Sequence, residues 1–208
     1  ASGAEYAPNI KKFVDQKCNV IIGVGFAIAG AIITSAKANP KIKYAIVDDS
    51  GLEPNADYTA FTAIKNVKGL TFKTQESSFL AGYAAAAFST KGVVATYGGA
   101  PYPTVTAFMD GFAQGVYYYN QVKKKGVRVL GWNRDTKNGE FVGDFANTSK
   151  ALQISKNFEQ AGADVIFPVA GGLGGATAQN SMDGGKSVTI WVDTDGFVSA
   201  NKYRSVLL

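Results

Sequence analysis

The sequence predicts an α/β fold built on parallel sheets, and three observations lead to that prediction. Short runs rich in β-branched residues alternate with longer segments of helical periodicity, as in strand–helix–strand units. Many of the 24 glycines stand at the ends of the apolar runs, where tight turns from strand to helix favour them. The length of 208 residues suits two compact lobes of about 100 residues each.

The first part of the chain contains three predicted strands and three predicted helices. Asn39 and Pro40 end the second of these helices, because proline cannot continue a helix. The third helix is made mostly of small residues, which favours close packing against a sheet or another helix. The strands are expected at residues 20–24, 44–47 and 70–74, and the helices at residues 9–16, 27–38 and 77–88.

The second part of the chain repeats the scheme and predicts a lobe with four strands. A polar loop is expected between its second strand and the following helix, and a short helix is expected after Gly171–Gly175. The strands are expected at residues 93–97, 127–132, 163–170 and 188–192, and the longer helices at residues 104–119 and 148–160.

The composition is that of a folded globular protein, with 46% apolar and 18% charged residues. The net charge of +5 has its densest cluster at Lys123–Lys125. This cluster is either a nucleic-acid patch or a solvated helix end. Gly126 follows directly and is typical of a helix end, so we favour the second interpretation and expect no nucleic-acid partner.

The sequence lacks the residues that most enzymes need. Histidine is absent, which removes the commonest general base and the commonest metal ligand. Cys18 is the single cysteine, so no intrachain disulfide forms. Asp48 and Asp49 are neighbours that would face opposite ways on a strand. We therefore predict no catalytic residues, no metal site and no cofactor.

Two glycine-rich segments are candidates for phosphate-binding loops. Gly23 and Gly25 follow a strand, but the next glycine, Gly30, comes five positions later where a dinucleotide fingerprint needs three. The Gly171–Gly175 segment offers backbone N–H groups at a helix start, which favours an anion or a carbonyl group. It lacks the Lys-Ser/Thr ending of a phosphate-binding loop, so nucleotide phosphate binding is disfavoured.

Four segments, taken in order, resemble the basic membrane protein family, the nucleoside-binding lipoproteins of bacterial ABC transporters. The resemblance covers essentially the whole chain. It is carried by QESSFLAGY at residues 75–83, by GGAPYP running on to FMDGFAQGV at residues 98–116, by GADVIFPVAGGLG at residues 162–174, and by residues 19–49.

This resemblance implies a type I periplasmic-binding-protein fold with two doubly wound lobes that close on ligand at a cleft. Residues 1–88 and 197–208 would form the first lobe, and residues 89–196 the second. The N-terminal lobe is expected to be incomplete in this chain, because the family's first strand, helix and second strand would precede Ala1. An aromatic partner for the ligand would lie there too, and a ligand-binding lysine would follow Leu208.

The resemblance also implies the site residues, since open parallel sheets bind ligands at the carboxyl ends of their strands. Phe145 lies where the family's Ser-Phe-x-Asp-Pro-like element has its base-stacking ring, although Asn147 replaces the acid and Thr148 the proline. The alternatives are a packing role alone for Phe145 and a helix-capping role alone for Asn147. Asp193 and Asp195 match a Val-Asp-x-Asp strand end that is expected to bind ribose or to cap a helix. The predicted ligand-binding residues are Gly25, Phe26, Asp48, Pro103, Phe145, Asn147, Gly171, Gly172, Asp193 and Asp195.

The implied function is that of an extracytoplasmic receptor, a cell-surface or periplasmic lipoprotein that delivers a purine nucleoside, or a similar small polar ligand such as another purine or a sugar, to an ABC permease. Membrane contact would come only through a lipid anchor outside this segment. No run approaches the roughly 18 apolar residues of a membrane span, and residues from Ala1 show no signal-peptide pattern. Two alternatives remain open: a ligand-sensing regulatory domain on the same fold, and a nucleotide-using Rossmann-like enzyme.

Overall fold

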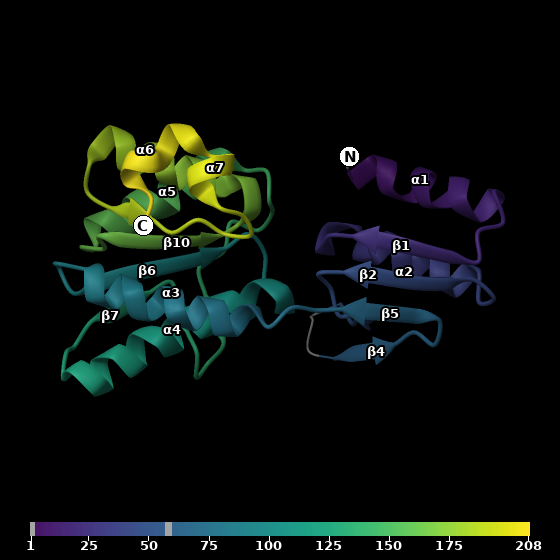
Figure 1. Cartoon of the computed structure of the whole chain (residues 1–208), viewed down its shortest axis with the longest axis horizontal. Helices are drawn as coiled ribbons and strands as arrows, with labels where there is room; N and C mark the ends of the chain where they lie inside the picture. The colour runs from purple at the N-terminus through teal and green to yellow at the C-terminus, as the bar shows by residue number, and fades with distance from the viewer. Residues whose placement is uncertain (1–2, 57–59) are drawn as a thin grey trace. The chain divides into compact units, whose positions relative to one another are not determined.

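The computed structural model describes residues 3–56 and 60–208. The chain forms two compact units, Ala1–Phe72 and Lys73–Leu208. Figure 1 labels most of the helices and strands of the two units.

The first unit is built on a three-stranded parallel sheet with the strand order β1-β2-β5. The predicted strand at residues 20–24 is confirmed, and the second predicted strand begins one residue earlier than expected. The helix expected at residues 9–16 begins earlier, with Pro8 inside it. The elements are α1 (Gly3–Asp15), β1 (Val20–Val24), the 3-10 turn η1 (Phe26–Ile28), α2 (Ala29–Ala38), β2 (Lys43–Val47) and β5 (Val67–Leu70).

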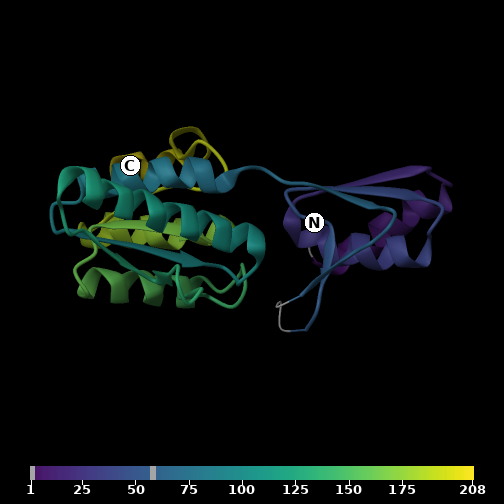
Figure 2. The same cartoon turned by 90° about the horizontal axis from the view of Figure 1, so that it is seen from below.

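Both helices of the first unit cover the same face of its sheet, as Figure 2 shows. The buried core between them consists of Ile10, Ile21, Ile32, Ala36, Tyr44 and Ile46. On the opposite face, the β1 side chains of Val20, Ile22 and Val24 are 57%, 61% and 76% exposed. The sheet of this unit is therefore covered on one side only within the described residues.

The third strand of the first unit was predicted wrongly. It lies at Val67–Leu70 instead of residues 70–74, and the following helix begins at Thr74. Lys68 and Gly69 interrupt the apolar pattern of this strand, which hid it in the sequence. A short antiparallel pair, β3 (Leu52–Pro54) and β4 (Phe61–Ala63), precedes the strand and was not predicted.

The second unit contains the predicted four-stranded sheet, and all of its strand pairs are parallel. The strand order is β11-β10-β6-β7, so β10 and β6 lie in the middle. Three of the strands, β7, β10 and β11, are shorter than predicted, and β6 is one residue longer. The strands are β6 (Val93–Gly98), β7 (Arg128–Leu130), β10 (Val165–Val169) and β11 (Val188–Thr189).

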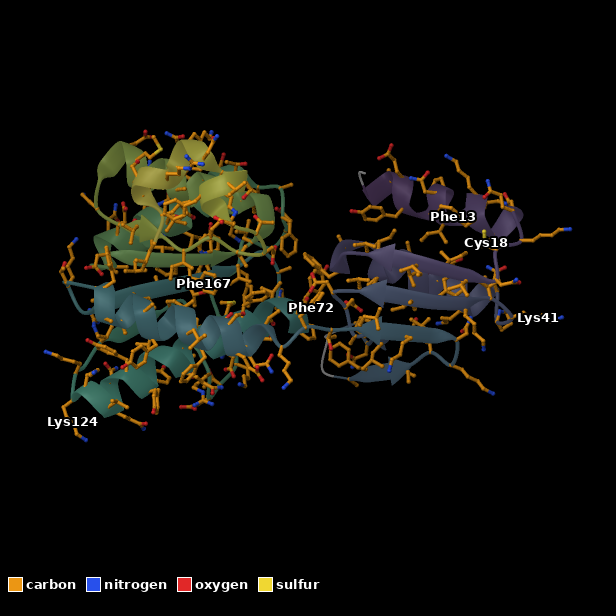
Figure 3. The ribbon with its side chains drawn as sticks, in the orientation of Figure 1. Phe13, Cys18, Lys41, Phe72, Lys124 and Phe167 are labelled. Atoms are coloured by element: carbon orange, nitrogen blue, oxygen red, sulfur yellow. The ribbon has the colours of Figure 1, made fainter. Side chains whose placement is uncertain are left out.

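Two helices cover each face of this second sheet (Figure 1). The pair α3 and α4 lies on one face, and α5 and α6 lie on the other. Alternate residues of β10 enter the two cores: Phe167, labelled in Figure 3, joins the α3/α4 side and Ile166 the α5/α6 side. The helices are α3 (Thr74–Phe88), α4 (Pro103–Lys123), α5 (Thr148–Gln160) and α6 (Gly174–Gly184).

The helices α3 and α4 pack backbone against backbone through glycines. A Cβ atom added at Gly115 would clash with the Phe79 carbonyl oxygen, and one at Gly82 would clash with that of Phe112. A Cβ at Gly111 would likewise meet the backbone of Gln75. The close packing expected for the small-residue helix is thus confirmed, and its partner is another helix.

The division between the units differs from the predicted lobe boundaries. Residues 73–88 belong to the second unit because α3 packs along α4. Residues 197–208 also belong to it: the 3-10 segment η3 (Asn201–Val206) packs on α6, and Leu207 forms a parallel bridge to Thr189.

Two smaller findings complete the second unit. The loop expected after β7 contains a short hairpin, β8 (Trp132–Asn133) with β9 (Asn138–Gly139). Helix α4 ends at Lys123, so the lysine cluster does lie at an exposed helix end, where Lys124 takes the left-handed conformation with φ of 53°. Figure 3 shows Lys124 at this end.

Candidate ligand-binding site

The carboxyl ends of the second unit's strands meet at one edge of the sheet, because all four strands run parallel. In the ladders, Val169 lies beside Gly98, and Ile166 lies beside Thr189. Continuing the first register by one residue brings Ala170 beside Gly99. The Gly99 amide also donates to the Val169 carbonyl oxygen at 2.9 Å. Gly99 and Gly171, which follow β6 and β10, both lie near the Phe145 ring at this edge.

Phe145 lies against this edge and is half-buried. A Cβ atom at Gly99 would overlap the Phe145 ring, so only glycine leaves room for the ring there. A Cβ at Gly171 would lie 3.9 Å from its Cδ1 atom. The Tyr102 ring is nearly parallel to that of Phe145, with an interplanar angle of 5° and a centroid distance of 6.2 Å. The structure therefore brings Phe145 together with two glycines at strand ends and one further aromatic ring.

The loop that carries Phe145 is held by short hydrogen bonds. The Asp144 carboxylate accepts from the Ala146 amide at 2.8 Å and from the Asn147 amide at 2.7 Å. These backbone bonds lower the pKa of Asp144, so the carboxylate stays charged and the turn stays closed near neutral pH. The Gly143 amide donates to the Gly99 carbonyl oxygen at 2.7 Å, which ties the loop to the strand end.

Asn147 caps helix α5. Its side-chain oxygen accepts from the Lys150 amide at 3.0 Å, which confirms the capping role considered from the sequence. Ligand contact by Asn147 stays a prediction, and it would fall to the amide nitrogen because the oxygen is engaged.

The two aspartates after β11 differ in their surroundings. Asp195 caps the short helix α7 (Gly196–Ser199), and its carboxylate accepts from the Phe197 amide at 2.9 Å. Asp193 accepts no hydrogen bond from any residue that the structure describes. Its side chain is exposed, yet neighbouring atoms partly desolvate the carboxyl, and this raises its pKa above the ordinary value. Asp193 is thus the carboxylate of the pair with free acceptor capacity.

The glycine-rich segment after β10 forms a 3-10 turn, η2 (Gly171–Leu173), that leads into α6. Gly171 has a φ of 54°, a conformation that favours glycine, and a Cβ at Gly172 would meet no atom within 4 Å. Backbone atoms at Gly172 are therefore open to an approaching group. Pro103 is the first residue of α4 and is exposed, so its predicted ligand contact stays a prediction.

The first unit gathers its own predicted residues at the carboxyl edge of its sheet. Val24 lies beside Val47, so the following residues, Gly25 and Asp48, are neighbours too. The Gly25 amide donates to the Val47 carbonyl oxygen at 3.0 Å, and Phe26 opens the turn η1. This small cluster repeats the construction of the second unit: a glycine, an aromatic ring and an acid at strand ends.

Tyr102 was not among the predicted residues, although its neighbour Pro103 was. The usable signal was an aromatic residue between two prolines in a strand-end loop, since prolines fix the backbone around it. Gly99 was missed as well, because its role depends on a contact that is distant in the sequence. The Phe145 ring occupies the space that a side chain at position 99 would fill.

In the part of the chain that the structure describes, none of the helices has the length and apolar character to cross a membrane. No cluster of three or more histidine, cysteine or acidic residues suited to a metal ion occurs among the same residues.

Comparison with solved structures gives the class of fold, which is that of type I periplasmic binding proteins. An ABC transporter solute-binding protein from Aeropyrum pernix K1 superposes with a TM-score of 0.66 at 22% identity, over 91% of this chain and 50% of that chain. The family follows from the sequence: the model of the ABC transporter substrate-binding proteins described as PnrA-like matches residues 1–206, and the chain belongs to this family.

Two curated relatives illustrate the similarity. The CD4+ T-cell-stimulating antigen of Listeria monocytogenes serovar 1/2a is 30% identical over 195 residues, which are 92% of this chain and 48% of the relative. The ABC transporter nucleoside-binding protein BmpA of Lactococcus lactis subsp. cremoris is 28% identical over 173 residues, covering 83% of this chain and 43% of the relative. The chain thus spans about half the length of the curated relatives that it matches.

Proposed function

We propose that this chain is the ligand-binding part of an extracytoplasmic receptor that captures a purine nucleoside and delivers it to an ABC permease. Family membership supports the receptor class. The similarity to the nucleoside-binding protein of Lactococcus lactis supports the ligand class. A lipid anchor on the full-length protein would keep the receptor at the membrane surface.

The observation that supports the proposal is the Phe145 ring, which lies against Gly99 at the carboxyl end of β6 and near Gly171 after β10. Asp193 follows β11 of the same sheet and accepts no hydrogen bond from the described residues. A purine nucleoside has a flat base and a ribose diol, and the edge offers a matching ring and a carboxylate with free acceptor capacity. Stacking of a base on an aromatic ring contributes about 1–3 kcal/mol in nucleic-acid complexes. Hydroxyl groups donate strongly to a charged carboxylate.

Other predicted residues of the second unit would add contacts to the same ligand. Gly171 and Gly172 would present backbone groups to it. None of these contacts requires chemistry on the ligand, so we propose that the protein binds without turnover.

Isothermal titration calorimetry of the protein with adenosine, guanosine, inosine and free ribose tests the proposal. We expect measurable heat with at least one nucleoside. The substitution Phe145→Leu should lower the affinity for nucleosides by about 10- to 100-fold, because stacking contributes roughly 1–3 kcal/mol. Ribose binding should change little.

Phe88→Leu is the matched control, because Phe88 is an exposed ring on α3. This variant should bind as the parent does. Absence of heat with all three nucleosides would refute the proposal. Chromatography of the nucleoside after incubation tests the enzyme alternative, which requires a product to appear.

A further inference from the structure

Tyr102 sits at a point where the backbone has little freedom. It is flanked by Pro101 and Pro103, which restrict its conformation, and it directly precedes helix α4. Its carbonyl oxygen accepts from the amides of Val105 and Thr106, each at 2.9 Å. Its own amide donates to the Ala100 carbonyl oxygen at 2.8 Å. The base of the Tyr102 side chain is therefore fixed by the start of the helix.

The ring of Tyr102 meets the ring of Phe145 in a parallel arrangement. The interplanar angle is 5° and the centroids are 6.2 Å apart, within the range of favourable aromatic pairs. The backbone of Gly99 approaches the Phe145 ring so closely that a Cβ there would overlap it. Gly171 lies near the Cδ1 atom of the same ring. Tyr102 and the two glycines thus restrict the plane of the Phe145 ring.

We propose that Tyr102 is a positioning residue that holds the Phe145 ring in the plane that stacks a flat base. This inference deepens the proposed function and rests on it. A ring that is already oriented loses less conformational freedom when a ligand arrives, so affinity rises without a new contact to the ligand. The benefit applies only to ligands that stack, so Tyr102 selects flat aromatic rings over sugars.

The test compares four forms of the protein by calorimetry with the best-bound nucleoside and with ribose: the parent, Tyr102→Leu, Phe145→Leu and the double variant. Tyr102→Leu should weaken nucleoside binding by about 2- to 10-fold, the range expected for one aromatic pair. Ribose binding should be unchanged. Tyr102→Phe keeps the ring and should restore the parent affinity.

The double variant decides whether Tyr102 acts through Phe145. We expect it to bind no more weakly than Phe145→Leu alone, because a positioning residue has no effect once its ring is gone. Fully additive losses, or an unchanged affinity of Tyr102→Leu, would overturn the inference while leaving the proposed function intact. A parent protein that binds no nucleoside refutes both together.

A purely structural role of Tyr102 gives a different pattern. It would lower the melting temperature of Tyr102→Leu and weaken nucleoside and ribose alike. Should Tyr102→Leu fail to fold, Tyr102→Met takes its place with the same expected results. The NMR signals of the Phe145 ring are those that disappear in Phe145→Leu. The flip rate measured from these signals should rise when the Tyr102 ring is removed. An unchanged rate would contradict the inference.

Discussion

Two aspartates at strand ends, Asp48 and Asp193, adopt the left-handed backbone conformation, with φ of 66° and 67°. Residues other than glycine rarely do so, and aspartate and asparagine tolerate it better than most. Asp48 directly follows β2, and Asp193 lies four positions after the last residue of β11. The same local backbone thus presents one carboxylate in each unit.

The substitution Asp193→Asn should weaken nucleoside binding and stabilise the fold. Affinity should fall by about 10- to 100-fold, because hydrogen bonds to a charged acceptor are worth roughly 1.5–3 kcal/mol. The raised pKa of Asp193 means that the folded state binds a proton more readily than the unfolded state. The charged carboxylate therefore costs stability at neutral pH, and this cost disappears as the pH falls through the raised pKa toward the ordinary value.

Urea denaturation at pH 7 and pH 4 measures the stability effect. Asp193→Asn should be more stable than the parent at pH 7, with a smaller difference at pH 4. The exposed Asp135→Asn serves as the control and should show no such pattern. A variant less stable than the parent at pH 7 would contradict the desolvation argument.

Sequence reasoning identified the types of residue at the site better than their partners. Phe145 and Asp193 were predicted from a motif and a strand end, and their contact with a ligand stays a prediction. Asn147 and Asp195 turned out to cap helices, since a carboxylate or amide at a strand end looks the same whether it faces a ligand or an amide. Tyr102 was missed because what marks it is the contact of its ring with the Phe145 ring. A contact between residues so far apart in the sequence leaves no local pattern.

Among the helices and strands, the closest packing is that of α3 along α4. Glycines at positions 82, 111 and 115 allow the two backbones to touch. Figure 2 shows the two helices side by side. This packing restricts the position of α4, and Tyr102 is the residue that directly precedes its first turn.

The substitution Gly115→Ala should destabilise the second unit by about 1–3 kcal/mol, because the added methyl group meets the Phe79 carbonyl oxygen and forces the helices apart. Gly30→Ala is a matched control on α2, where an added Cβ meets no atom within 4 Å. That control should stabilise the protein by up to about 1 kcal/mol, since alanine favours helix. Thermal denaturation followed by circular dichroism compares the two, and equal effects of the same sign would contradict the packing argument.

Periodicity predicted some elements better than others. The helix at residues 148–160 and the strand at residues 20–24 appear with the predicted bounds. Strand β5 was misplaced because a charged residue and a glycine break its apolar run. Helix α3 starts earlier than predicted, and no side chain caps its first turn to mark the place.

At the scale of the molecule, the chain divides into two units that each bury a core of their own. The chain length and the alternation of strands and helices predicted two lobes, with residues 73–88 and 197–208 placed in the first of them. The boundary between the units was not predictable, since it depends on which sheet a helix packs against.

Ile46→Ala should lower the stability of the first unit by about 2–5 kcal/mol, because Ile46 is fully buried in its core. Both tryptophans, Trp132 and Trp191, belong to the second unit. Tryptophan fluorescence should therefore report an unchanged unfolding transition while circular dichroism shows an earlier first step. Ile166→Ala, at an equally buried site of the second unit, should shift the fluorescence transition. A fluorescence shift of the same size in both variants would show that the units unfold as one.

The uncovered side of the first unit's sheet has a consequence for how the protein behaves in solution. Val20, Ile22 and Val24 form a row of branched aliphatic groups on an outer strand. Burying these apolar side chains against another apolar surface is favourable, because it removes them from water. An edge strand also has unpaired backbone N–H and C=O groups that can pair with a strand of another molecule. Concentrated samples of the chain should therefore tend to cluster, and they should do so more readily when warmed than when kept cold.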